Sequence, residues 1–254
     1  MLFDRIVLAP FDALRVSLFP KKCMGCGEVI DEDRELCVTC EKNLIPIDHK
    51  KRCKFCGIER EFCTCKARVY YFKYVIGIYE NDGIAKHILY KYKLSKNCHY
   101  AEFIADKMAE GIKTEFNKIK FDAVISVPTS PHSTLSRGFD HSKLLAEIIA
   151  DKLNVRYRND IIKCKFFKKS QHKSKYKERF ANMKDKYYVN HKCKYDNVLL
   201  VDDIKTTGAS LDACAKQLLL SGAKNVYCVT FLESVHKKSV GLSMMCYKIR
   251  KLRR

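Results

Sequence analysis

The apolar residues of this chain fall into short strand-like runs separated by segments in which they recur at helical spacing. The run Val198–Val201 has no polar alternation, which is typical of a parallel strand covered on both faces. Phe121–Pro128 predicts a second buried strand, and Val226–Glu233 predicts another. Helical spacing predicts helices at Ile84–Leu94, Tyr100–Phe116, Ser142–Leu153 and Ala209–Ser221. This alternation predicts an α/β fold with a mainly parallel sheet and helices on both faces.

The chain divides into three predicted parts. Residues 1–19 form a mildly amphipathic arm, which we expect to pack on its own protein rather than on a membrane. Residues 20–68 form a cysteine-rich module. Residues 69–254 form the α/β domain, which is expected to begin with a strand or hairpin at Val69–Tyr79.

The charge balance of the chain is strongly basic. Its 254 residues include 49 Lys and Arg but 29 Asp and Glu, a formal net charge of +20. This excess favours polyanionic partners, and it leaves both nucleic acid and an anionic membrane surface open. No run of about eighteen apolar residues predicts a transmembrane helix, and charged residues interrupt the first apolar positions, so a signal peptide is not expected. We expect a cytoplasmic protein that is not an integral membrane protein, with docking at the inner face of the membrane left open.

Eight of the fourteen cysteines occur in closely spaced pairs in the amino-terminal part. These residues are Cys23, Cys26, Cys37, Cys40, Cys53, Cys56, Cys63 and Cys65. A CxxC knuckle points both sulfurs at one ion, and two knuckles complete a tetrahedral site. A disulfide scaffold is the alternative, but in a cytoplasmic chain this spacing favours zinc-bound thiolates. The segment is too short to hold a core of its own, so we expect structural zinc.

Sequential pairing of the knuckles predicts two zinc sites. The first takes the four cysteines up to Cys40, and the second takes the four from Cys53, whose last pair has an unusual CxC spacing. Basic residues surround them and form either a solvated face or a contact for nucleic acid. These are Lys50, Lys51, Arg52, Lys54, Lys66 and Arg68.

The strand Val198–Val201 leads into two carboxylates and a loop of small residues. Asp202 and Asp203 come first, and the loop and the helix start that follow are Thr206, Thr207, Gly208, Ala209 and Ser210. The amides of such a loop and the positive end of the helix dipole can hold a phosphate, while glycine allows close backbone approach. Two adjacent acids can accept hydrogen bonds from hydroxyl groups. A phosphate beside a cis diol describes ribose 5-phosphate, although most strand–turn–helix units with such a turn bind nothing.

The thirteen positions from Val198 to Ser210 resemble the phosphoribosyl pyrophosphate (PRPP) motif of type I phosphoribosyltransferases. Across Pro20 to about Phe231, the chain resembles the ComF family of competence-associated proteins. The further signs are the cysteine-rich module, a Val-Pro strand end before an Arg-Gly-Phe loop, and the spaced Gln171, Glu178, Arg179 and Asn182. The chain departs from the family at Asp140-His141, where Asn-Gln is usual, and at Ser174-Lys175, where Leu-Ser is usual.

This resemblance implies a type I phosphoribosyltransferase-like α/β fold with a small N-terminal zinc-ribbon module. It implies that PRPP binds with magnesium, with the phosphate at the loop, Asp202 and Asp203 on the ribose hydroxyls, and Arg137 near the pyrophosphate. It also implies handling of single-stranded DNA during natural transformation, that is, DNA uptake into the cytosol. An inner-membrane DNA channel and a helicase are the partners it suggests.

The segment Phe166–Lys186 corresponds in the family to a mobile flap over the sugar-phosphate site. Its basic residues can close on pyrophosphate or contact a nucleic-acid backbone, and a solvated loop is the plain alternative. The nucleic-acid candidates are Lys168, Lys169, Lys173, Lys175 and Arg179. The predicted helix Ile84–Leu94 is also basic, with Tyr90 and Tyr92 between its lysines, and we favour core positions for these tyrosines over base stacking.

Two other functions fit the same residues. The first is an active phosphoribosyltransferase that transfers ribose 5-phosphate from PRPP to a nucleobase or a related acceptor. The second is a regulator that senses PRPP. The sequence identifies no catalytic acid or base near the anomeric carbon, so enzymatic activity stays open.

Overall fold

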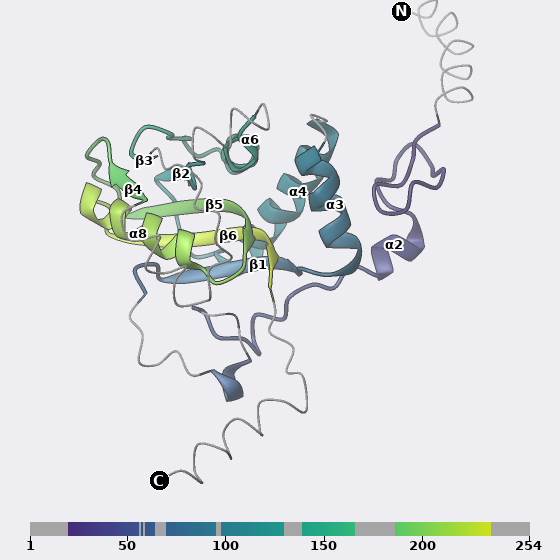
Figure 1. Ribbon diagram of the computed structural model, residues 1–254, viewed down its shortest axis with the longest axis horizontal. Helices are drawn as coiled ribbons and strands as arrows, with labels where there is room; N and C mark the ends of the chain where they lie inside the picture. Colours follow the sequence, from purple (N-terminus) through teal and green to yellow (C-terminus); the bar gives the residue numbers. More distant parts are fainter. Residues whose placement is uncertain are drawn as a thin grey trace, which may run out of the picture.

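A computed structural model describes residues 20–55, 57, 59–63, 70–94, 98–129, 139–165 and 186–234 (Figure 1). Its helices are α2 (Val38–Lys42), the 3-10 helix η1 (Arg60–Phe62), α3 (Gly83–Leu94), α4 (Cys98–Glu115), α6 (His141–Leu153) and α8 (Ala209–Ser221). Its strands are β1 (Tyr74–Glu80), β2 (Ala123–Ser126), β3 (Ile162–Cys164), β4 (Tyr187–Val189), β5 (Asn197–Lys205) and β6 (Asn225–Glu233). None of the helices in these ranges combines the length and the apolar composition needed to span a bilayer.

Four parallel strands form the central sheet in the order β1-β6-β5-β2. β5 is an inner strand that pairs with β6 along its whole length and with β2 over its first half. The residues from Val198 to Val201 are fully buried, which confirms the strand that their apolar run predicts. β3 and β4 form a separate antiparallel pair. Because β2 and β5 are parallel neighbours, the loops that follow them leave the same edge of the sheet.

Helices cover both faces of this sheet (Figure 1). On one face Ile88 of α3, Ile104 of α4 and Leu145 of α6 share a buried cluster with Leu199. On the other face α8 and the β3–β4 pair form a second cluster, to which Leu200 points. Leu199 and Leu200 are neighbours on β5 and belong to clusters on opposite faces, because successive side chains of a strand point to opposite faces of the sheet. The predicted α/β fold class is confirmed.

The first strand differs from its prediction. β1 begins at Tyr74, whereas the apolar pattern predicted a strand or hairpin from Val69. The backbone N–H of Tyr71 donates to the carboxylate of Asp212 in α8 at 2.8 Å, and the first bond to the sheet comes at Lys73, whose N–H donates to the Val226 carbonyl at 2.8 Å. Both β1 and the segment before it are rich in aromatic residues, so aromatic content alone does not show at which residue the strand begins.

The cysteine-rich module packs against the sheet and shares its core. Cys23 and Cys40 are buried in the same cluster as Ile88 of α3. Backbone hydrogen bonds then fasten the segment after α2 to the outer edge of β1; one of them runs from Ile47 N–H to the carbonyl of Ile78 at 3.1 Å. These bonds cover part of the free edge of β1, which would otherwise be open to pairing with another strand. The predicted boundary near residue 68 stays a prediction.

Candidate functional site

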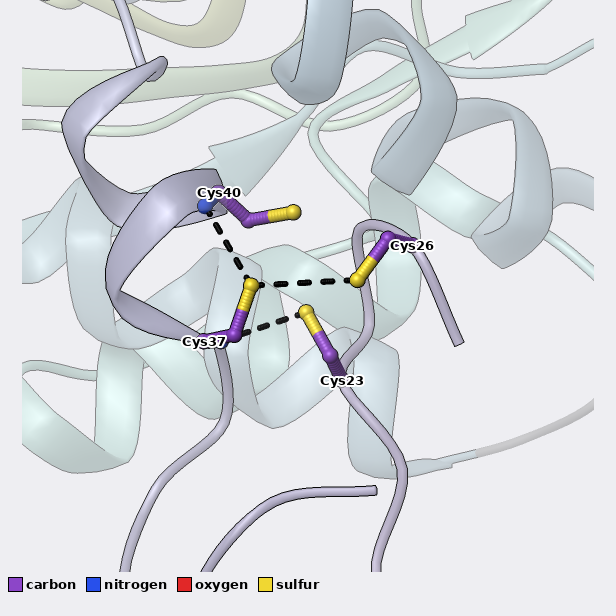
Figure 2. Close-up of side chains that lie close together, drawn as sticks. All are labelled: Cys23, Cys26, Cys37 and Cys40. Carbon is purple, nitrogen blue, oxygen red and sulfur yellow. Dashed lines mark hydrogen bonds between the residues drawn. The ribbon is translucent and has the colours of Figure 1, made fainter. Parts of the chain in front are cut away.

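The sulfurs of Cys23, Cys26, Cys37 and Cys40 converge between the first knuckle and α2 (Figure 2). All four Sγ atoms lie within 4.8 Å of one another, and those of Cys26 and Cys37 are 3.7 Å apart. A tetrahedral zinc with Zn–S bonds of about 2.3 Å requires sulfurs about 3.8 Å apart, so this donor set fits zinc. Four protein ligands fill the coordination sphere. The site is therefore suited to a structural ion and leaves no open position for chemistry.

Backbone amides stabilise negative charge in this cluster. The N–H groups of Gly25 and Cys37 donate to the sulfur of Cys23 at 3.4 and 3.2 Å. Burial raises the pKa of Cys23, but these donors and the nearby Cys26 outweigh it and lower the pKa to about 6. Burial and the neighbouring thiols raise the pKa of Cys40. A cation among the four sulfurs would favour the thiolate form of Cys40, and zinc supplies that charge.

The Cys53–Cys56 knuckle, called the second knuckle from here on, repeats the backbone of the Cys23–Cys26 knuckle, called the first. The glycine after each CxxC pair is left-handed, with φ of 83° at Gly27 and 76° at Gly57. Its N–H donates to the carbonyl of the first cysteine, at 2.9 Å to Cys23 and at 3.1 Å to Cys53. An antiparallel bridge closes each turn. Because Cys56 and Cys65 lie outside the described residues, the second set of ligands stays a prediction.

Arg52 of this knuckle has a structural role. Its guanidinium forms an ion pair with Glu80 at 3.0 Å, in which both side chains are about nine-tenths buried. It also donates to the carbonyl of Gly57 at 3.1 Å. Of the basic residues around the cysteines that the sequence suggests as nucleic-acid contacts, Arg52 is therefore engaged within the protein.

Asp202 and Asp203 lie at the carboxyl end of β5, where three elements meet. The Ser142 hydroxyl at the start of α6 donates to Asp202 Oδ1 at 2.8 Å. Lys93 Nζ at the end of α3 pairs with Asp203 Oδ2 at 2.8 Å. Burial and the adjacent Asp203 charge raise the pKa of Asp202 to about 7, against the lowering effects of Ser142 and Lys93. One carboxylate is thus neutralised by an ion pair, and the other is poised to lose its proton near neutral pH.

The loop after these carboxylates ends at the first turn of α8. Gly208 is left-handed, with φ of 76°, and forms the N-cap of this 13-residue helix. The Ala209 N–H donates to Thr207 Oγ1 at 3.3 Å, which shapes the turn. The side chain of Ser210 is hydrogen bonded to Tyr187 of β4, and burial raises the pKa of that tyrosine. The helix start and the paired acids therefore lie together at one edge of the sheet, as the sequence predicted.

Sequence reasoning missed Ser142 and Lys93. Ser142 opens the helix after β2, so the expectation that β2 and β5 end at one edge could have led to it. Lys93 comes from a helix that precedes the motif by more than a hundred residues, and no spacing signals its ion pair with Asp203.

Residues 14–69 match the double zinc ribbon domain. The chain is 29% identical over 105 residues to the DNA utilization protein YhgH of Escherichia coli O6:H1, covering 41% of this chain and 46% of that protein. It is 28% identical over 108 residues to Competence protein F of Haemophilus influenzae, covering 41% of this chain and 47% of that protein. These matches are consistent with the resemblance to the ComF family. The chain spans about half the length of the curated relatives it matches.

Solved structures similar to this chain include two phosphoribosyltransferases. One is an adenine phosphoribosyltransferase, with a TM-score of 0.38 and 17% identity, covering 55% of this chain and 73% of that one. Another is the orotate phosphoribosyltransferase of Aeropyrum pernix, with a TM-score of 0.34 and 15% identity, covering 62% and 80% of the two chains.

Two positions that depart from the usual ComF sequence have local roles here. Asp140 caps α6 by accepting the N–H of Lys143 at 3.1 Å. His141 is buried, and its Nε2 lies 3.1 Å from the carbonyl oxygen of Lys93. Tyr92 is buried and donates its hydroxyl to the His141 carbonyl at 2.9 Å, which confirms a core position for this tyrosine. The core position predicted for Tyr90 is wrong, because its side chain is exposed. His141 therefore links α6 to α3, while Asp140 caps α6, and both directly precede Ser142, which donates to Asp202.

Several predicted site residues lie outside the described part of the chain. They are Arg137, Lys168, Lys169, Lys173, Lys175 and Arg179. Their roles stay predictions.

Proposed function

We propose that this protein belongs to the ComF family, binds PRPP at the loop between β5 and α8 and handles single-stranded DNA during DNA uptake into the cytoplasm. The observation that supports PRPP binding best is the pair Asp202 and Asp203 beside the N-terminal end of α8. Adjacent carboxylates and a helix start offer complementary contacts to a diol and a phosphate of the same sugar.

In the proposed complex the ribose hydroxyls donate to Asp202 and Asp203, while the 5′-phosphate accepts from the amides of residues 206–210. Lys93 offsets the charge of Asp203, which limits repulsion between the carboxylates and the ligand. Arg137 is the proposed partner of the pyrophosphate. Magnesium would be held chiefly by pyrophosphate and sugar oxygens and would keep several waters.

The DNA part of the proposal rests on charge and on relatives. The net charge of +20 favours a polyanion, and two relatives are named for DNA utilization and for competence. The cysteine module and the basic residues between Phe166 and Lys186 are the proposed contacts. A membrane DNA channel and a helicase are the proposed partners. The proposed location is the cytoplasm, at the inner face of the membrane.

Titration calorimetry with PRPP and magnesium tests the sugar-phosphate site. Replacing both Asp202 and Asp203 by alanine should weaken binding by about 1.5 to 3 kcal/mol for each charge-assisted hydrogen bond that the ribose no longer makes. Asp151→Ala, which removes an exposed carboxylate of α6, is the matched control and should bind as the wild type does. Unchanged affinity in the double variant would rule out the assignment.

An active phosphoribosyltransferase is the alternative. In that reaction the C1′–O bond to pyrophosphate breaks, a C1′–N bond to the base forms, and pyrophosphate leaves with both electrons of the broken bond. Incubation with PRPP, magnesium and a panel of nucleobases or single-stranded DNA, followed by a pyrophosphate assay, separates the two functions. Pyrophosphate release above background would make the protein an enzyme, whereas binding without release supports the proposed role.

A further inference from the structure

Helix α3 buries one side and exposes an aromatic and basic stripe on the other. Ile88 and Tyr92 are fully buried, whereas Tyr90 is 59% exposed and Leu94 is 67% exposed. Tyr90 and Leu94 are four residues apart, and so are Lys86 and Tyr90, so the three side chains follow one another along the same side of the helix. Tyr90 therefore stands on the surface between a lysine and a leucine.

A hollow of about 460 Å³ adjoins this stripe, and we call it the α3 hollow. Its lining consists of Asn81, Gly83, Lys86, His87, Leu89, Tyr90, Lys93, Ile204 and Leu232. Leu89, Ile204 and Leu232 give it apolar surface, and the lysines give it positive charge. Its volume falls in the range typical of sites for small organic groups, which is about 300 to 1,000 Å³.

The α3 hollow adjoins the sugar-phosphate site. Lys93 belongs to its lining and pairs with Asp203 at 2.8 Å. Ile204, another lining residue, directly follows Asp203 on β5. A group bound in the hollow therefore lies next to the carboxylates proposed to hold ribose.

We propose that the α3 hollow binds a base of single-stranded DNA, stacked on Tyr90, with the neighbouring phosphates at Lys86 and Lys91. This inference rests on the proposed DNA function and adds a binding surface outside the cysteine module and the Phe166–Lys186 segment. An exposed aromatic ring combined with lysines is the means by which proteins hold single strands without reading their sequence. A double helix keeps its bases stacked inside, so it cannot offer this group to the hollow.

The experiment uses the full chain and a fluorescently labelled oligothymidylate that carries one 2-aminopurine. Tyr90→Ala should weaken binding about 5- to 150-fold, as expected when one base no longer stacks on an aromatic ring. Tyr90→Phe should keep the affinity and the quenching of 2-aminopurine, because the ring alone is needed. Tyr90→Ala should also leave the salt dependence, the zinc content and the affinity for PRPP unchanged.

The matched control is Tyr71→Ala. Tyr71 is 41% exposed and has the Lys216 ammonium 5.6 Å from its ring centroid, but it lies outside the α3 hollow. This variant should bind the oligonucleotide as the wild type does. A second variant, Lys86→Gln with Lys91→Gln, should flatten the dependence of log affinity on log salt by about 0.7 for each phosphate that is no longer neutralised.

The outcomes separate this inference from the proposed function. If the wild type binds single strands and Tyr90→Ala binds equally well, the inference is wrong and the proposed function stands. If the wild type does not bind single strands, the proposed DNA function itself fails. If free thymidine at equal concentration competes as strongly as the oligonucleotide and protects 2-aminopurine from quenching, the hollow binds a free nucleoside and not a base within a strand, and the inference is wrong.

Discussion

Lys205 and Glu233 form an ion pair in the interior of the protein, at directly paired positions of β5 and β6. Their side chains are 0% and 3% exposed. Gly57 of the Cys53–Cys56 knuckle covers this pair so closely that a Cβ there would collide with Glu233 Oε1. Lys205 is also the last residue of β5 before the loop of the PRPP-type motif. The pair therefore connects the cysteine module to the start of that loop.

Glu233→Gln should destabilise the fold strongly, because it removes the carboxylate charge that faces the buried Lys205 ammonium. We expect a loss of about 3 to 5 kcal/mol in the free energy of unfolding, measured by urea denaturation. Lys224→Gln is the control, since Lys224 pairs with Asp196 at the surface and both side chains are exposed. A loss below about 1 kcal/mol in Glu233→Gln would mean that water reaches the pair in solution.

The metal content should respond to each knuckle separately. We expect two zinc ions per chain in protein purified without chelator, and one after replacement of Cys23 and Cys26 by serine. Replacement of Cys53 and Cys56 should remove the other ion, because the turn at Gly57 has the same backbone conformation as the turn at Gly27 in the first knuckle. Metal analysis measures both. Cys164→Ser, outside both knuckles, should keep two ions, and a wild type with less than one ion per chain would contradict the zinc assignment.

The sequence predicts those features that depend on neighbouring residues. The apolar run Val198–Val201 specifies a buried strand, and the spacing of Cys23, Cys26, Cys37 and Cys40 specifies a converging donor set. Both signals are local: a continuous apolar run is stable only when both faces are covered, and a knuckle positions two sulfurs within four residues.

The partners of the carboxylates could not be predicted in the same way. The sequence places Asp202 and Asp203 at a strand end, but their bonds to Ser142 and Lys93 depend on how α6 and α3 pack on the sheet. The burial of Lys205 beside Glu233 could not be predicted from the sequence either. In the sequence it is one lysine of a basic chain, and only the pairing of β5 with β6 buries it beside a carboxylate.

The affinity for PRPP should rise with pH through neutrality. The pKa of Asp202 is raised to about 7, so its carboxyl is largely protonated below that pH, and the ribose hydroxyls donate best to its ionised form. We expect tighter binding at about pH 8 than at about pH 6, with protons released on binding, both measurable by calorimetry in buffers of different ionisation enthalpy.

Ser142→Ala distinguishes the titration of Asp202 from that of the PRPP phosphates. The Ser142 hydroxyl lowers the pKa of Asp202, so its removal raises that pKa and should move the midpoint of the affinity profile to higher pH. The phosphate groups of the ligand are the same in both proteins. An identical midpoint in the variant and the wild type would mean that Asp202 is not the group that titrates.

Binding of single-stranded DNA should fall steeply with salt. About four to six phosphate contacts predict a log–log slope near −3 to −4, with slight sequence preference. Replacement of Lys168, Lys169, Lys173 and Lys175 by glutamine should flatten the slope by about 0.7 for each phosphate that these lysines neutralise. The control replaces the exposed Lys113, Lys118 and Lys120, which precede β2 at the opposite edge of the sheet. Affinity that does not change between low and moderate salt would remove the physical support for DNA handling.

The most direct measurement is a crystal structure of the protein with PRPP and magnesium. We predict that the 5′-phosphate lies against the amides of residues 206–210 and that the two ribose hydroxyls lie within hydrogen-bond distance of Asp202 and Asp203. We also predict that Arg137 contacts the pyrophosphate. Ligand density elsewhere on the protein, with the Asp202 carboxylate still accepting from the Ser142 hydroxyl and the Asp203 N–H, would contradict the proposed site.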